Sequence, residues 1–141
     1  MFHKILVPID LAHLEALQPA LQVSADLAIH YDAELCYLGV TATTPGAVAR
    51  TPEEYARKLS ALAENQKQTH GQRVSSHCVS SPDPVADLDE SILGAIRDLN
   101  IDLVIMQTHL PMHLDALVPA HGGRIASQAA VSCFLIRGEG E

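Results

Sequence analysis

The sequence lacks several features that would assign it to a class at once. Aromatic residues make up only 4% of its 141 residues and tryptophan is absent, so an apolar core has to be built from Leu, Ile, Val and Ala. The sequence has nine Lys and Arg residues but 17 Asp and Glu residues, which gives a formal net charge of −8. No apolar run approaches the roughly 20 residues of a membrane-spanning helix. We therefore expect no broad electrostatic surface for nucleic acid and no membrane insertion.

Cysteine is also scarce, and its distribution is informative. Cys36, Cys78 and Cys133 each lie in an apolar, strand-like segment. An odd number of such residues is typical of free, buried thiols in a reducing compartment, and their spacing fits no zinc site. The amino-terminal segment already has a strand pattern and does not resemble a signal peptide. These features predict a cytoplasmic protein.

The sequence does contain a regular alternation of apolar runs and helical repeats. The runs cover residues 4–9, 34–40, 73–80, 102–107 and 133–137. Between them lie helical patterns that begin near Gln18, at the capping sequence after Thr51, at Asp83-Pro84, and after Gly122-Gly123. We expect the second pattern to end at Gly71, and the third, which has Val85 on its apolar stripe, to end at Asn100. Strands that alternate with helices are typical of α/β domains. We therefore predict one domain over residues 1–141, with a five-stranded parallel sheet covered by helices on both faces.

Four of these segments resemble the universal stress protein family. The segments are KILVPID (4–10), DAELCYLGV (32–40), NIDLVIMQTH (100–109) and SCFLIR (132–137), which are similar to that family's first, second, fourth and fifth strands. The resemblance implies a flavodoxin-like strand order 3-2-1-4-5, as in the adenine nucleotide alpha hydrolase-like fold. It also implies a homodimer made by antiparallel pairing of the last strands, here through Cys133, Phe134, Leu135 and Ile136.

Many members of that family bind ATP beyond the carboxyl ends of the strands, so the resemblance also implies a site. Asp10 matches the acidic residue that follows the first strand, and Val40 matches the residue after the second strand whose backbone holds the adenosine. From the residues alone, Asp10 could equally cap the turn that follows it, and the two roles are compatible.

The family's phosphate motif is Gly-x-x-Gly, nine residues, Gly-Ser/Thr, and its glycines are absent here. Gln107, Thr108, His109 and Leu110 stand at its first half, and Ala120-His121 at its second, or Pro119-Ala120 if the loop is one residue shorter. Glycine lets backbone N–H groups approach phosphate closely, and Pro111 and Pro119 each remove a donor. The loss should weaken a triphosphate site more than an adenosine site.

Two further features of this loop have alternative interpretations. Gly122-Gly123-Arg124 could form a shifted anion site at a helix N-terminus, or only a flexible entry to that helix. His109 and His113 are four residues apart, a spacing that could chelate a metal in a helix, but the proline between them favours solvated loop histidines. We therefore predict no metal site.

These observations predict a dimeric stress-response or regulatory binding module rather than an enzyme, with weak or no ATP binding and no required cofactor. The alternative is an adenine-nucleotide sensor that binds ATP or AMP through Asp10, Val40 and the variant loop, with slow ATPase activity. A metal- or thiol-dependent enzyme is disfavoured because no hydrolytic triad or carboxylate pair assembles from the sequence.

Overall fold

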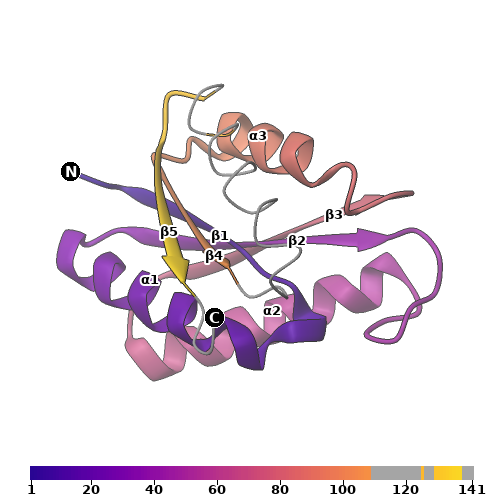
Figure 1. Cartoon of the computed structure of the whole chain (residues 1–141). Helices are drawn as coiled ribbons and strands as arrows, with labels where there is room; N and C mark the ends of the chain where they lie inside the picture. Colours follow the sequence, from indigo (N-terminus) through magenta and orange to yellow (C-terminus); the bar gives the residue numbers. More distant parts are fainter. Residues whose placement is uncertain (109–124, 126–128, 138–141) are drawn as a thin grey trace.

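The computed structural model describes residues 1–108, 125 and 129–137, which contain one sheet and three α-helices (Figure 1). Its strands are β1 (Lys4–Pro8), β2 (Glu34–Ala42), β3 (Val74–Ser81), β4 (Leu103–Thr108) and β5 (Ser132–Arg137). All neighbouring strands are parallel and their order is β3-β2-β1-β4-β5. The predicted five-stranded parallel sheet and its strand order are therefore confirmed.

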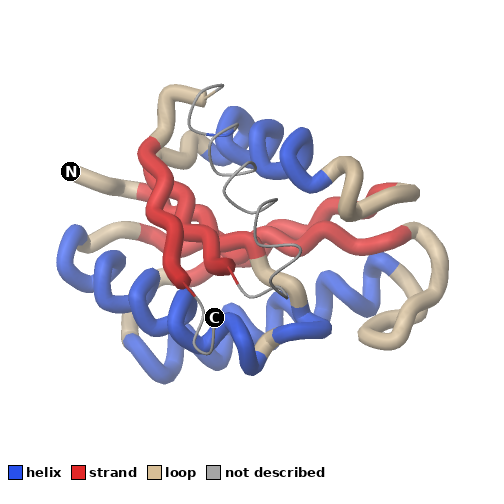
Figure 2. The backbone as a smooth tube through the Cα atoms, viewed as in Figure 1, coloured by secondary structure: helices blue, strands red, loops and turns tan. Residues whose placement is uncertain are grey.

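The helices cover both faces of this sheet. They are α1 (Gln18–Tyr31), α2 (Pro52–His70) and α3 (Leu88–Leu99), and two short 3₁₀ turns, η1 (Leu11–His13) and η2 (Glu15–Leu17), precede α1. In Figure 1, α1 and α2 lie below the sheet and α3 lies above it. Figure 2 shows the same three layers, with strands in red between helices in blue. Connections between parallel strands thus cross on both faces, as the alternation in the sequence requires.

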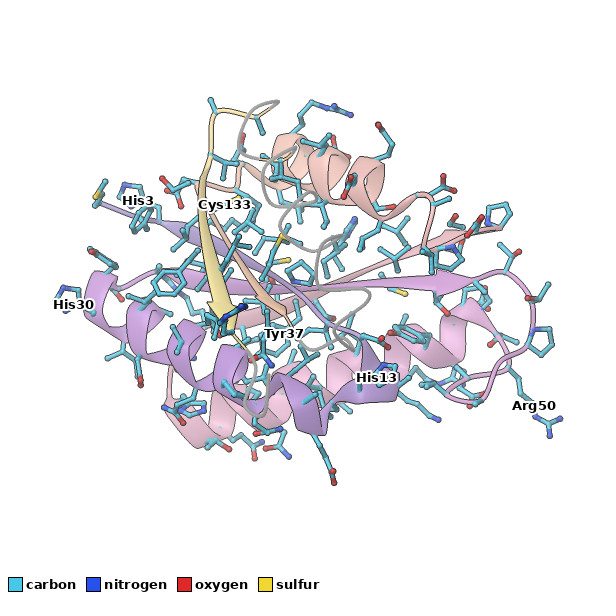
Figure 3. All side chains as sticks on the ribbon, viewed as in Figure 1. His3, His13, His30, Tyr37, Arg50 and Cys133 are labelled. Atoms are coloured by element: carbon cyan, nitrogen blue, oxygen red, sulfur yellow. The ribbon has the colours of Figure 1, made fainter. Side chains whose placement is uncertain are left out.

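Two aliphatic clusters fill the spaces between these layers. Ile105, on the face toward α1 and α2, and Val104, on the face toward α3, are both 0% exposed. Tyr37 of β2 belongs to the cluster beneath the sheet in Figure 3. Burial on both faces explains why the central strands read as continuous apolar runs rather than as alternating patterns.

Local sequence signals set the ends of the helices. The Thr51 hydroxyl accepts a hydrogen bond from the Glu54 N–H (3.1 Å), and Pro52 occupies the first position of α2. Gly71 ends this helix with a φ of +79°, and Asn100 ends α3 with a φ of +58°. These are the caps and stops that the sequence predicts.

The third helix begins later than predicted, at Leu88 rather than at Asp83-Pro84. The Asp83 carboxylate accepts from the Ala86 N–H (3.2 Å), and the Asp83 carbonyl accepts from the Asp87 N–H (3.0 Å), so this segment forms a turn. Val85, which the helical pattern places on the buried stripe, is 82% exposed. These are the bonds of a helix N-cap, but they close only a single turn, because Asp87 (φ −96°, ψ 7°) departs from the helical conformation just before Leu88.

The side chains of the edge strands are more exposed than those of the central strands, so not all three cysteines are buried as predicted. Only Cys36, on β2, is fully buried; Cys78 on β3 and Cys133 on β5 are half-buried. All three are free thiols. Within the described part of the chain, no helix has the length and apolar character to cross a membrane.

Candidate functional site

The residues predicted for an adenosine site lie at the carboxyl edge of the sheet. β1 pairs with both β2 and β4, and its last pair with β2 is Pro8 with Leu38. Asp10 and Val40 each lie two residues beyond this pair. The structure therefore brings these two residues to the same level of neighbouring strands, at the edge where open parallel sheets bind ligands.

The Asp10 carboxylate contacts the turn that follows it. Its Oδ1 accepts from the Ala12 N–H (3.0 Å), and its Oδ2 lies 2.8 Å from His13 Nδ1. His13 lies on the segment between β1 and α1 (Figure 3), and both side chains are about half exposed, at 48% for Asp10 and 58% for His13. The capping role predicted for Asp10 is confirmed, and its contact with a ligand stays a prediction.

Gln107, at the first glycine position of the family motif, extends from β4 to the beginning of α1. Its Oε1 accepts from the Ala20 N–H (2.8 Å), and its Nε2 donates to the Ala16 carbonyl. The two backbone groups fix the orientation of the amide, because an N–H can only donate and a carbonyl can only accept. Gln107 is 7% exposed. Its amide therefore satisfies one of the backbone donors that the first turn of a helix leaves without a partner.

Tyr55, from the first turn of α2, reaches the same edge, although no motif in the sequence indicates a role for it. Its hydroxyl accepts from the Leu11 N–H (3.2 Å), and the residue is 6% exposed. Burial raises the pKa of Tyr55, and the negative charge of Asp10 raises it further, whereas the bond from Leu11 opposes both. The sequence feature that could have indicated this contact is Gly39, because a glycine inside an apolar strand often marks the close approach of another group. In the structure, a Cβ atom at Gly39 would lie 2.8 Å from Tyr55 Cε1.

The remaining predicted site residues fall at or beyond the end of β4. Thr108 is the last residue of that strand. The predictions for His109, Leu110, His113, Pro119, Ala120, His121, Gly122, Gly123 and Arg124 lie outside the described residues. Within the described ranges, no group of three or more His, Cys, Asp or Glu side chains is arranged to hold a metal ion.

Comparison with known proteins assigns the chain to a family. The model of the universal stress protein family matches residues 1–137. The chain belongs to the universal stress protein family. A search of curated proteins, by contrast, found no significant match.

Solved structures share the fold of this universal stress protein. A family member from Burkholderia pseudomallei is 22% identical, with 96% of each chain covered and a TM-score of 0.68. A universal stress protein from Archaeoglobus fulgidus, solved in complex with dAMP, is 12% identical, with 96% of this chain and 98% of that chain covered and a TM-score of 0.65. A family protein from Arabidopsis thaliana, solved with AMP bound, is 10% identical, with 98% and 93% covered and a TM-score of 0.69.

Proposed function

We propose that this chain is a non-enzymatic stress-response binding module of the cytoplasm, whose carboxyl edge takes an adenosine group and binds ATP weakly or not at all. The observation that carries the proposal is the common level of Asp10 and Val40 at the ends of two paired strands. The relatives solved with AMP and dAMP support a nucleoside monophosphate as the ligand class. The three free thiols support a reducing compartment.

The contacts at this edge disfavour a triphosphate. Four phosphate charges need several donors, and backbone N–H groups at a helix N-terminus are the usual source. Here the Ala20 N–H at the start of α1 already donates to Gln107, and the Ala12 N–H already donates to Asp10. The net charge of −8 adds a general repulsion toward an anion. A ligand of low charge is therefore favoured over ATP.

Calorimetric titration of the unmodified protein with adenosine, AMP and ATP–Mg²⁺ tests this proposal. We expect measurable binding of adenosine and AMP, weaker binding of ATP, and loss of adenosine binding in Asp10→Ala. ATP binding as tight as AMP binding would contradict the proposal. If that ATP binding also disappeared in Arg124→Ala, the alternative nucleotide sensor would replace the binding module proposed here.

We also propose that the protein is a homodimer through β5. This strand forms one edge of the sheet, where Phe134 is 44% exposed and Leu135 is 43% exposed. An exposed apolar edge strand favours aggregation unless it is paired, and antiparallel pairing with a second copy would continue the sheet across two subunits.

Light scattering tests the dimer. We expect a mass about twice the 15.1 kDa of one chain. Phe134→Lys should give a monomer, whereas Ile29→Lys, at a 55% exposed position on α1, should leave the dimer intact. An unmodified protein that is monomeric and soluble at micromolar concentration would refute this part of the proposal.

A further inference from the structure

The hydrogen-bond ladder between β1 and β2 ends where the candidate site begins. The Ile9 N–H donates to the Leu38 carbonyl at 2.7 Å, one residue past the last paired residues of β1. In a parallel ladder the donors from one strand recur every second residue, and so do the acceptors of its neighbour. The next bond of a continued ladder would therefore join the Leu11 N–H to the Val40 carbonyl.

That next bond is replaced by a bond to a side chain. The Leu11 N–H donates instead to the Tyr55 hydroxyl at 3.2 Å. The chain leaves the extended conformation at the same residue, because Asp10 is still extended (φ −104°, ψ 105°) and the 3₁₀ turn η1 starts at Leu11. The backbone groups of Val40 face β1, as those of Leu38 do, because alternate residues of a strand point to the same side. The Val40 carbonyl therefore faces β1 without the Leu11 N–H that a continued ladder would supply.

Tyr55 is held firmly enough to impose this arrangement. Its ring occupies the space that Gly39 leaves open, since a Cβ atom at Gly39 would lie 2.8 Å from Tyr55 Cε1 and 2.9 Å from Leu59 Cδ2. The start of α2 is fixed by the Thr51 cap, and the Tyr55 N–H donates to the Thr51 carbonyl at 3.1 Å. The side chain therefore joins three elements: α2, the end of β2 and the turn after β1.

We propose that Tyr55 is a positioning residue for the adenosine site: its hydroxyl captures the Leu11 N–H, separates the Asp10 turn from β2, and leaves the backbone of Val40 open to a nucleobase. This inference rests on the proposed function and adds a residue that does not itself contact the ligand. The base of adenosine carries an amino donor and ring-nitrogen acceptors, which match a backbone carbonyl and N–H.

The test compares two tyrosines on the same side of the sheet. Tyr55→Phe removes the hydroxyl that accepts from Leu11. Tyr37→Phe is the matched control, because Tyr37 is 0% exposed in the same layer and its hydroxyl has no hydrogen-bond partner among the residues that the structure describes. Adenosine affinity is measured by calorimetry, and exchange of the Leu11 amide hydrogen is measured by NMR, for the unmodified protein and for both variants.

We expect Tyr55→Phe to bind adenosine up to about tenfold more weakly, because the loss of the bond to Leu11 lets the turn leave the arrangement that keeps Val40 open and so lowers the fraction of binding-competent protein. We also expect its Leu11 amide to exchange faster. Tyr37→Phe should match the unmodified protein in both measurements. A loss of stability alone would not change the dissociation constant while the protein stays folded. Gly39→Ala, whose Cβ would displace the Tyr55 ring, should resemble Tyr55→Phe and replaces it if that variant fails to fold.

Unchanged adenosine affinity in Tyr55→Phe would overturn the inference. If the unmodified protein itself does not bind adenosine, the proposed function fails, and Leu11 exchange alone then decides the role of Tyr55. Faster exchange in Tyr55→Phe but not in Tyr37→Phe would still establish that Tyr55 positions the turn. Equal exchange in all three proteins would refute it.

Discussion

Replacing Gln107 with alanine removes the side chain that joins β4 to the beginning of α1. Gln107 is 7% exposed and binds the Ala20 N–H (2.8 Å) and the Ala16 carbonyl. The first backbone donors of a helix have no partner within the helix. In the variant, an N–H group and a carbonyl group therefore lose their partner at the same place, and a small void replaces the side chain.

The expected cost follows from these two bonds. An intramolecular hydrogen bond contributes about 0.5–1.5 kcal/mol, and a buried group left without a partner costs about 1–3 kcal/mol. The Ala20 N–H is buried and takes the larger cost, whereas the Ala16 carbonyl is only partly buried and takes the smaller one. Together they suggest a loss of about 2–4 kcal/mol, a large part of the roughly 5–15 kcal/mol of a typical domain. Since about 1 kcal/mol moves the melting temperature of a domain of this size by about 3 °C, we expect a decrease of about 6–12 °C.

Thermal and urea denaturation followed by circular dichroism measures this loss. Gln18→Ala is the matched control, because Gln18 is exposed at the start of the same helix and its amide lies a long 3.5 Å from the Leu14 carbonyl. The control should stay within about 0.5 kcal/mol of the unmodified protein. If the two variants melted together, the bonds of Gln107 would contribute no stability and the reasoning would be refuted.

Gln107→Glu separates the two bonds of this residue. A carboxylate keeps the acceptor for the Ala20 N–H but places a negative charge against the Ala16 carbonyl, where the amide donated. Burial and this contact should raise the pKa of the introduced carboxyl above its unfolded value, so the variant should be less stable at neutral pH. Its deficit should shrink as the pH falls, because the protonated acid can donate again.

Three further predictions concern the core and the strand ends. Ile105→Asp places an unpaired carboxylate at a 0% exposed position and should cost several kcal/mol, seen as loss of cooperative unfolding near ambient temperature; a melting temperature within a few degrees would contradict it. Asp102→Ala removes the acceptor of the His3 N–H (2.8 Å) and the Lys4 N–H (3.1 Å). The free energy of unfolding should therefore fall by about 1–3 kcal/mol, measured as a lower midpoint in urea denaturation. Burial raises the pKa of the Cys36 thiol above its ordinary value of 9.0. The unfolded chain therefore loses the thiol proton at a lower pH than the folded chain, and stability falls as the pH rises above 9.0. This fall should be shallower in Cys36→Ala, and equal slopes would exclude Cys36 as its source.

The sequence predicts most of this fold because its signals are local. The cap at Thr51 and the stop at Asn100 depend on residues within a few positions of each other, and the structure confirms both. Continuous apolar strands indicate a sheet covered on two faces. The start of α3 differs from the prediction for a local reason too, since Asp83 caps only a single turn and Asp87 departs from the helical conformation before Leu88.

The contacts of the candidate site could not be predicted in the same way. Gln107 and Ala20 are 87 positions apart, and Tyr55 and Leu11 are 44 apart. No periodicity or spacing in the sequence reports such a bond, because it depends on which strands become neighbours and on where each helix begins. Family resemblance identified Gln107 only as a missing glycine, whereas its own hydrogen bonds became visible only in the folded chain.

Asp10, Tyr55 and Gln107 act on the same segment, and this has a consequence for ligand choice. Each of them accepts a backbone N–H from the stretch that runs from the end of β1 through the first turn of α1, at Ala12, Leu11 and Ala20 respectively. A segment whose donors have partners within the protein is ordered before a ligand arrives, so a ligand bears little of the entropic cost of ordering it. The same bonds leave those donors unable to receive a phosphate without breaking existing contacts. In the proposed site, order in this connection and selection against a highly charged ligand therefore have one physical cause.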